Sequence, residues 1–179
     1  MAIPVPSPAE GVAELAEQAR AGSPAALGAL YRRFGPGLYR LAYRLSGSKE
    51  DAEDIVHDVF VGLPEALQRY EERGRLDAWL KRLTARVALM KLRAGRRRAT
   101  LRLEDHDTAT EPQRQPETGE LQAAVDALPL SLRSVLVLKE IEGYSHSEIA
   151  EMLGISAVAS RVRLMRAISR LRRTLGVNR

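Results

Sequence analysis

The segment 145–173 constrains the fold more than any other part of the chain, because it contains the signals for two helices and the turn between them. Ser145 is followed three residues later by Glu148, the capping-box spacing that satisfies backbone N–H groups at a helix start. Gly154 can adopt the left-handed conformation found at helix ends, and Ser156 is a suitable N-cap. The sequence therefore predicts two short helices joined by a glycine turn.

The second of these helices carries its charge on one side. Residues 157–173 contain six arginines and no acidic residue, and the side expected to pack inward consists of Ser160, Leu164, Ala167 and Leu171. A helix-turn-helix places such a helix in the DNA major groove, where its first turn approaches base edges and guanidinium groups bridge phosphates or pair with guanine. The alternative is a solvated arginine face on a packing helix. The coincidence of capping box, glycine turn and one-sided charge favours DNA binding.

A second, longer basic helix is predicted from Leu76 to about Arg98, after a polar loop at 69–75. Its apolar side is expected to include Leu76, Trp79, Leu80, Leu83, Val87 and Met90, and its basic side Lys81, Arg82, Arg86, Lys91, Arg93, Arg96, Arg97 and Arg98. Positive charge beside an accessible aromatic ring, here Tyr70 in the loop, is typical of single-stranded DNA binding. Trp79 has two interpretations, as a second stacking ring or as part of the domain core.

Acidic residues are segregated from these basic helices. Although the net charge is only +5, residues 48–72 hold eight acidic and two basic residues, whereas residues 75–102 hold ten basic residues and one acidic residue. Two basic zones separated by an acidic one indicate two separate contacts with a polyanion. The acidic helix predicted at 50–58 has either a solvated face or a face for a basic protein partner, and composition alone favours the first.

The chain is predicted to be all-helical and divided into two small domains. Aromatic residues make up only 4% of it, and no alternating strand pattern occurs. Residues 104–118 contain almost nothing apolar and form the clearest linker. We therefore expect a helical extension at 1–22, a helical bundle at 23–99, a flexible acidic linker at 100–118 and a helix-turn-helix domain at 119–179.

Several local breaks are expected within these domains. Gly35-Pro36-Gly37 is predicted to interrupt a helix, Ser46-Gly47-Ser48 to form a turn, and Pro64 to kink a helix or start a new one. Past the linker, Pro129 is expected to end one helix and Ser131 to cap the next.

The residues available disfavour an enzyme. The chain has no cysteine, its histidines (His57, His106 and His146) do not share a metal-ligand spacing, and it contains neither a P-loop nor a Gly-x-Gly-x-x-Gly turn. We therefore expect no catalytic residue, metal, cofactor or small-molecule substrate. No signal peptide and no apolar run long enough to span a membrane occur in the sequence, so a soluble cytoplasmic protein is expected.

Three segments, in this order, resemble bacterial RNA polymerase sigma factors of the extracytoplasmic-function (ECF) type. Asp51-Ala-Glu-Asp-Ile-Val-His-Asp-Val-Phe60 is similar to the family's Asp-Ala-Glu-Asp-Leu-Val-Gln-Glu-Thr-Phe segment in region 2. Ala78-Trp79-Leu80 with the basic helix after it resembles the promoter-melting helix. Leu128-Pro129 through Glu142-Gly143-Tyr144-Ser145 to Leu153-Gly154-Ile155-Ser156 resembles region 4. The resemblance covers roughly residues 23–98 and 119–173, and it implies two helical domains joined by a flexible linker.

The resemblance also implies partners and roles. The chain would bind core RNA polymerase and promoter DNA, direct melting and initiation at a stress- or signal-responsive set of genes, and be held inactive by an anti-sigma factor. The implied polymerase-binding residues are Asp51, Glu53, Asp54 and Asp58. Those implied at the melted −10 element are Tyr70, Arg73, Arg75, Trp79, Lys81, Arg82, Arg86, Lys91 and Arg93. Those implied at the duplex −35 element are Ser156, Ala157, Ser160, Arg161, Val162, Arg163, Arg166 and Arg170.

Four residues depart from the family's pattern. Arg86 and Met90 stand where relatives often have Asn and Asp in the melting helix. Ser160 stands where a core Val or Ala is common, and Val162 stands where a small hydroxyl residue is common. Val162 either contacts a thymine methyl group or is simply exposed. The −35 sequence therefore cannot be copied from relatives.

Two other functions fit parts of the sequence. A dimeric repressor or activator would use the C-terminal helix-turn-helix on duplex operators without polymerase, but it leaves the second basic helix unexplained. An interaction protein, such as an anti-sigma antagonist that mimics a sigma factor, would need few DNA contacts, and the arginine-rich C-terminus disfavours it.

Overall fold

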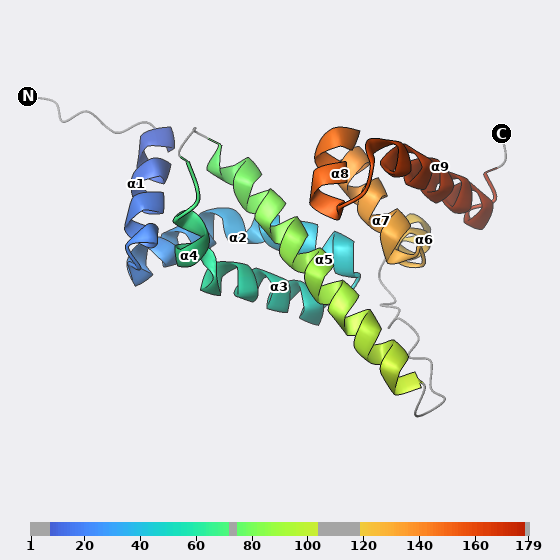
Figure 1. Ribbon diagram of the computed structural model, residues 1–179, viewed down its shortest axis with the longest axis horizontal. Coiled ribbons are helices and arrows are strands. Elements are labelled where there is room, and N and C mark those ends of the chain that lie inside the picture. Colours follow the sequence, from blue (N-terminus) through green and yellow to red (C-terminus); the bar gives the residue numbers. More distant parts are fainter. Residues whose placement is uncertain (1–7, 72–74, 104–118, 178–179) are drawn as a thin grey trace, which may run out of the picture. The chain divides into compact units, whose positions relative to one another are not determined.

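The computed structural model describes residues 8–71, 75–103 and 119–177, without the side chains of 8–10 and 96–103. Every regular element in this part of the chain is a helix, which confirms the predicted all-helical fold (Figure 1). Most of the predicted linker and the predicted DNA-binding residue Arg73 lie outside the described residues.

The contacts within the chain define two compact units. The first unit comprises Met1–Tyr43 and Lys49–Val87, and the second comprises Arg44–Ser48 and Ala88–Arg179. The division falls inside the long helix α5 (Leu76–Leu103), which continues beyond the end predicted near Arg98. Residues 100–103, which the sequence analysis assigned to the linker, are therefore helical.

Helices α1 (Pro8–Arg20) and α2 (Pro24–Ser46) begin the chain. The predicted interruption at Gly35-Pro36-Gly37 is wrong, because α2 continues through Pro36. The apolar positions before and after Pro36 keep one helical register, and the buried residues among them are Ala26, Leu30, Leu38, Leu41, Ala42 and Leu45. Each buried leucine contributes roughly 1.5–3 kcal/mol, whereas a proline inside a helix costs about 3 kcal/mol. Burial of the stripe therefore outweighs the break.

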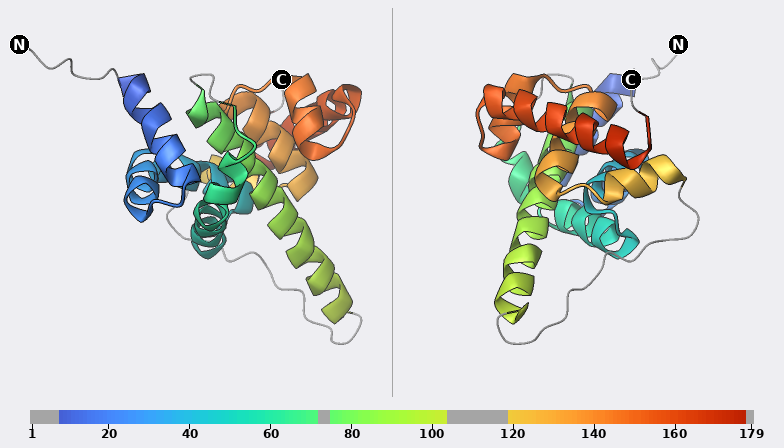
Figure 2. Two further views of the ribbon diagram at one scale, coloured as in Figure 1. Left: turned by 60° about the vertical axis from the view of Figure 1, so that its left-hand side comes forward. Right: turned by 90° about the vertical axis from the view of Figure 1, so that its right-hand side faces the viewer.

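Helices α3 (Lys49–Val61) and α4 (Leu63–Leu67) follow the predicted turn, where Gly47 has a φ of +77°. The buried side of α3 consists of Ala52, Ile55, Val56 and Val59. Pro64 starts α4 and does not kink α3, because it lies in the first turn, where a missing N–H costs no hydrogen bond. Helix α1 packs against α4 (Figures 1 and 2).

The second unit contains the helix-turn-helix. Besides the last part of α5, its helices are α6 (Glu120–Asp126), α7 (Leu130–Leu136), η1 (Val137–Ile141), α8 (His146–Leu153) and α9 (Ala157–Thr174). Element η1 is a turn of π-helix that extends α7, and the sequence did not predict it. The prediction that Ser131 caps α7 is wrong. Pro129 takes the N-cap position, and its carbonyl oxygen accepts hydrogen bonds from the N–H groups of Leu132 and Arg133.

Helix α9 packs against α6, α7 and α8. The core at this contact consists of Leu128, Leu136 and Ala167, with Val125, Leu132, Leu164, Ile168 and Leu171 packed against them. The predicted inward side of α9 is confirmed, since Ser160 and Ala167 are buried and Leu164 and Leu171 are partly buried. The packing leaves α9 with one side in the core and the other at the surface.

Candidate nucleic-acid interfaces

Side-chain caps fix the start of both helices of the helix-turn-helix. At α8, Oγ of Ser145 accepts a hydrogen bond from the N–H of Glu148 at 3.2 Å, and the Glu148 carboxylate accepts one from the N–H of Ser145 at 2.9 Å. The predicted capping box is therefore confirmed. At α9, Oγ of Ser156 accepts from the N–H of Ala159 at 3.0 Å. Between the helices, Gly154 has a φ of +64°, a conformation that strains any residue with a Cβ.

Ser160 contacts α8 and not the surface. It is fully buried, and its Oγ lies 2.9 Å from Nδ1 of His146, the first residue of α8. This burial contradicts the predicted contact of Ser160 with DNA. Desolvation lowers the pKa of His146, the charges of Lys139 and Arg161 lower it further, and Glu140 opposes them. These effects favour the neutral imidazole, which shares a hydrogen bond with the serine.

The opposite side of α9 is at the surface. Of the residues predicted at duplex DNA, the exposed ones are Ser156, Arg161, Val162, Arg166 and Arg170, and the partly exposed ones are Ala157 and Arg163. Val158 and Met165 were not among the predicted residues, although they are 64% and 70% exposed. The sequence does contain a signal for these two residues. Together with Val162 they repeat, two residues earlier, the spacing of the core positions 160, 164 and 167. Two residues turn a helix by about 200°, onto the opposite side.

The basic side of α5 is exposed over much of its described length. Arg82, Arg86 and Arg93 are exposed, and Lys81 and Lys91 are partly exposed. Met90 was predicted on the apolar side, and this prediction is wrong, because its side chain is 67% exposed. The two residues before it, Ala88 and Leu89, are buried, so the buried side of α5 at this level is not the predicted one.

A hollow of about 370 Å³ lies at the start of α5. Its lining consists of Arg69, Tyr70, Glu71, Arg75, Ala78, Trp79 and Arg82. The ring of Tyr70, which we expected to be accessible, is only 8% exposed and packs against Trp79 with 4.8 Å between the ring centroids. Trp79 is partly exposed, so it is the ring with more surface available for stacking. An aromatic surface with arginines around it suits a nucleobase and its phosphate.

The end of helix α1 is hydrogen-bonded to the segment that forms one wall of this hollow. Nη2 of Arg20 donates a hydrogen bond to the carbonyl oxygen of Tyr70 at 2.9 Å, and Nε2 of Gln68 donates to the carbonyl oxygen of Arg20 at 3.1 Å. Glu17 pairs with the Arg20 guanidinium at 3.1 Å. The sequence analysis gave α1 no role, because no short motif marks a contact between a side chain and a backbone group fifty residues away.

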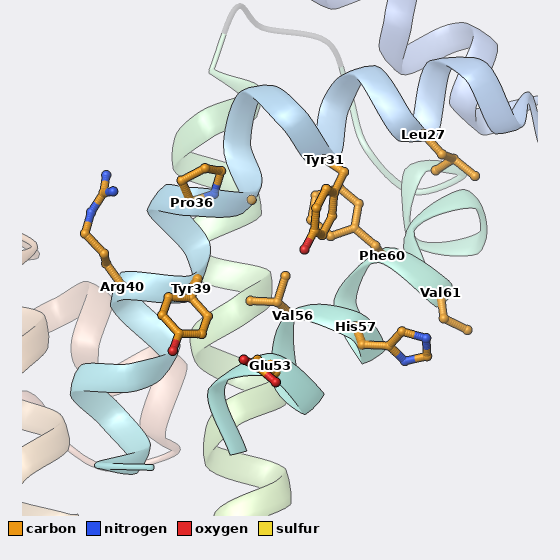
Figure 3. A pocket seen from close by; sticks show the side chains of 11 residues that line it. Leu27, Tyr31, Pro36, Tyr39, Arg40, Glu53, Val56, His57, Phe60 and Val61 are labelled. Carbon is orange, nitrogen blue, oxygen red and sulfur yellow. The ribbon is translucent and has the colours of Figure 1, made fainter. Parts of the chain in front are cut away.

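Helix α3 presents the predicted acidic face at the surface. Glu53, Asp54 and Asp58 are exposed, and Asp51 is partly exposed. Beside them a groove of about 950 Å³ runs between α2 and α3 (Figure 3). Its lining consists of Leu27, Tyr31, Gly35, Pro36, Tyr39, Arg40, Glu53, Val56, His57, Phe60 and Val61.

Aromatic and aliphatic side chains dominate this groove. Tyr31 and Phe60 meet edge to face with 5.0 Å between ring centroids, and Tyr31 and Val61 are 52% and 67% exposed. Desolvation raises the pKa of Tyr39, and the negative charge of Glu53 adds to this effect. The groove was not predicted from the sequence, because its two walls come from different helices. An apolar groove with a carboxylate at its edge suits an amphipathic helix with basic residues.

Within the part of the chain that the structure describes, no group of three or more His, Asp or Glu side chains is placed to hold a metal ion. Among the same residues, no helix has the length and apolar character needed to cross a bilayer.

Comparisons with known proteins match two parts of the chain. The Sigma-70 region 2 family matches residues 30–98, and the Sigma-70, region 4 family matches residues 118–171. The ECF RNA polymerase sigma factor SigE of Mycolicibacterium smegmatis is 38% identical over 152 residues, which cover 80% of this chain and 59% of SigE. This chain therefore spans less than two thirds of the length of SigE.

A second relative is covered more fully. The ECF RNA polymerase sigma factor SigM of Mycobacterium tuberculosis is 32% identical over 165 residues, covering 92% of this chain and 84% of SigM. Among solved structures, the sigma factor RpoE from Bartonella quintana, crystallised with the anti-sigma factor NepR, has the same fold. Its TM-score is 0.66 at 22% identity, over 83% of this chain and 96% of RpoE.

Proposed function

We propose that this chain, which belongs to the ECF RNA polymerase sigma factors of the sigma-70 family and directs RNA polymerase to promoters, does so through three surfaces. These are the outer side of α9, the basic side of α5 with the hollow at its start, and the acidic face of α3 with its groove. The observation that carries the proposal is the pair of exposed basic helix faces, one on a capped helix-turn-helix and one beside an aromatic hollow. As a sigma factor the chain contributes no catalysis of its own.

The outer side of α9 binds the −35 element as duplex DNA. Its capped N-terminus enters the major groove, and its arginines pair with phosphates. The residues proposed for this contact are Ser156, Ala157, Arg161, Val162, Arg163, Arg166 and Arg170. Ser160 is left out, since its buried hydroxyl supports α9 from the inner side.

The start of α5 binds the −10 element as a melted strand. Extruding a base from the duplex costs a few kcal/mol, and stacking on one aromatic ring returns about 1–3 kcal/mol. We assign that stacking to the half-buried ring of Trp79, with Tyr70 behind it. Phosphate contacts supply the remainder, from Arg73, Arg75, Lys81, Arg82, Arg86, Lys91 and Arg93.

The acidic face of α3 binds core RNA polymerase. Asp51, Glu53, Asp54 and Asp58 attract a basic helical segment, and the groove beside them takes up its apolar side chains. An anti-sigma factor acts on this chain by covering surfaces that the polymerase needs. The chain works in the cytoplasm, at a set of genes that answers a stress or another signal.

Charge reversal on α3 tests the polymerase contact. In the double variant Asp54→Lys with Asp58→Lys, two attractive charges become repulsive. We expect the affinity for core polymerase, followed by co-elution in gel filtration, to fall at least tenfold (~1.4 kcal/mol or more). Matched reversals at Glu14 and Glu65, exposed residues on α1 and α4, change the net charge equally and should leave assembly intact. Equal assembly in both double variants would remove α3 from the polymerase interface.

Binding and transcription assays on the purified chain distinguish the three proposed functions. A sigma factor co-elutes with core polymerase and starts run-off transcription at a defined site. A dimeric repressor or activator binds duplex DNA without polymerase. A sigma mimic binds an anti-sigma factor but supports no transcription.

A further inference from the structure

We infer that α9 reads bases mainly through an apolar strip that recognises the 5-methyl groups of thymine, while its arginines hold the phosphates on both sides. The apolar strip consists of Val158, Val162 and Met165. The inference rests on the proposed function of α9 as the helix that reads duplex DNA. It assigns sequence reading to side chains other than the arginines.

The apolar strip lies at the middle of the exposed side of α9. Val158, Val162 and Met165 are 64%, 37% and 70% exposed. They repeat, two residues earlier, the spacing of Ser160, Leu164 and Ala167, which form the inward side. A shift of two residues is about 200° around a helix, so the strip points directly away from the core. In a helix-turn-helix, the side opposite the core faces the floor of the major groove.

Arginines flank the strip on both sides. At 3.6 residues per turn, one flank consists of Arg163, Arg166, Arg170 and Arg173, and the other of Arg161 and Arg172. All six are exposed or partly exposed, and α9 contains no acidic residue. A helix lying in the major groove has a phosphate backbone on each side, so cations on both flanks match both walls of the groove.

The chemistry of the strip selects thymine. Neither valine nor methionine offers a strong donor or acceptor for the base edges, so the strip cannot read the hydrogen-bond pattern of the groove floor. The 5-methyl group of thymine is the apolar group exposed there. Arginine pairing with guanine would require a guanidinium at the middle of the exposed side, and the strip places apolar side chains at that position. The two arginine flanks favour duplex DNA as the occupant over a protein with an apolar patch.

Single-methyl replacement in a promoter tests this inference. The chain assembled with core RNA polymerase would first select its upstream and downstream elements from a random duplex library. Each thymine of both elements would then be replaced singly by deoxyuridine, which lacks only the methyl group. We expect affinity to fall about three- to fourfold at one or more upstream thymines, the effect of removing one buried methyl.

Variants of the strip complete the test. In the triple variant Val158→Ala, Val162→Ala and Met165→Ala, the same upstream replacements should become neutral, which is a double-mutant cycle between the strip and the methyl group. Val177→Ala, an equally conservative change at a residue 57% exposed beyond the end of α9, should leave the methyl effect unchanged. Arg166→Ala should weaken binding to all sequences and retain the methyl effect. It should also make the slope of log affinity against log salt concentration shallower by about 1.

Each contrary outcome has a distinct meaning. If an upstream element is selected but no upstream replacement lowers affinity, or if the strip variant keeps the methyl effect, α9 does not read thymine through the strip. If replacement is neutral and the strip variant instead assembles poorly with polymerase, the strip belongs to a protein interface. If no upstream element is selected at all, the proposed function of α9 fails, and this inference fails with it.

Discussion

Ser160 and His146 place a polar contact inside the helix-turn-helix, at a position where an apolar residue would also pack. The serine is fully buried, and its Oγ lies 2.9 Å from Nδ1 of the histidine. A buried hydroxyl without a partner would destabilise the fold by about 1–3 kcal/mol. The pair therefore fixes how the start of α9 sits on the start of α8, and so where the exposed side of α9 points.

The protonation of His146 gives a prediction about pH. Desolvation, Lys139 and Arg161 lower its pKa in the folded chain below the ordinary value of 6.5. Its contribution to stability is therefore fully present above about pH 6.5. It is lost as pH falls toward the lowered folded pKa, because the unfolded chain then binds the extra proton.

We expect the free energy of unfolding to fall between about pH 7.5 and about pH 5.5, and to fall less in His146→Gln. Urea denaturation of the purified chain at a series of pH values measures this difference. His57→Gln, at an exposed histidine on α3, is the control and should follow the wild type. An unchanged slope in His146→Gln would show that the contact with Ser160 does not depend on the neutral ring.

At the scale of elements, α1 holds the loop that follows α4. The Arg20 guanidinium donates to the Tyr70 carbonyl, and the Tyr70 ring packs against Trp79. One hydrogen bond thus connects the end of α1 to the hollow proposed to hold a base. Arg20, which belongs to no recognised motif, thus helps to hold Tyr70 in place at the hollow.

Removing that hydrogen bond should loosen the hollow. We expect Arg20→Met to lower the free energy of unfolding by about 1.5 kcal/mol, the low end for a charged donor because the Arg20 side chain is 28% exposed. Trp79 is the only tryptophan of the chain, so a red shift of its emission should accompany the change. Arg32→Met, at an exposed arginine of α2, should alter neither quantity. A normal emission spectrum in Arg20→Met would contradict the supporting role of α1.

Helix α2 shows how packing overrides a local signal. Glycine and proline at 35–37 favour a break, yet the apolar stripe on either side is in phase and buries leucines before and after Pro36. The reverse case is Met90, which continues the predicted apolar period along α5 but is exposed, whereas Ala88 and Leu89 beside it are buried. Periodicity predicts which residues share a side of a helix, and it does not predict which side the neighbouring elements cover.

At the scale of the whole molecule, the charge pattern predicts two DNA contacts that can be lost separately. The basic side of α5 and the outer side of α9 lie on different helices, and we propose that they bind different forms of DNA. Binding to the melted strand and to the duplex both weaken with salt. The slope of log affinity against log salt concentration is about −0.7 per phosphate contact for a single strand and about −0.9 for a duplex.

Two double variants should therefore have different defects. Arg82→Ala with Arg86→Ala should reduce permanganate reactivity of the −10 thymines and lower the salt slope by about 1.4, while binding to a −35 duplex persists. Arg163→Ala with Arg166→Ala should lower the slope by about 1.8 and abolish preference for the −35 element, while a pre-melted −10 template still supports initiation. Identical defects in the two variants would contradict separate contacts.

The sequence by itself determined the caps at Ser145 and Ser156, the helix-turn-helix, the inward side of α9 and the segregation of charge. These follow from interactions within a few residues, as in the Ser145–Glu148 box, or from the period of one helix. The tertiary structure alone decided that Tyr70 is buried and Trp79 partly exposed, that Arg20 reaches the Tyr70 carbonyl, and that α2 and α3 enclose a groove. Those outcomes depend on which distant segments meet, because burial and cavities arise between elements and no local spacing encodes them.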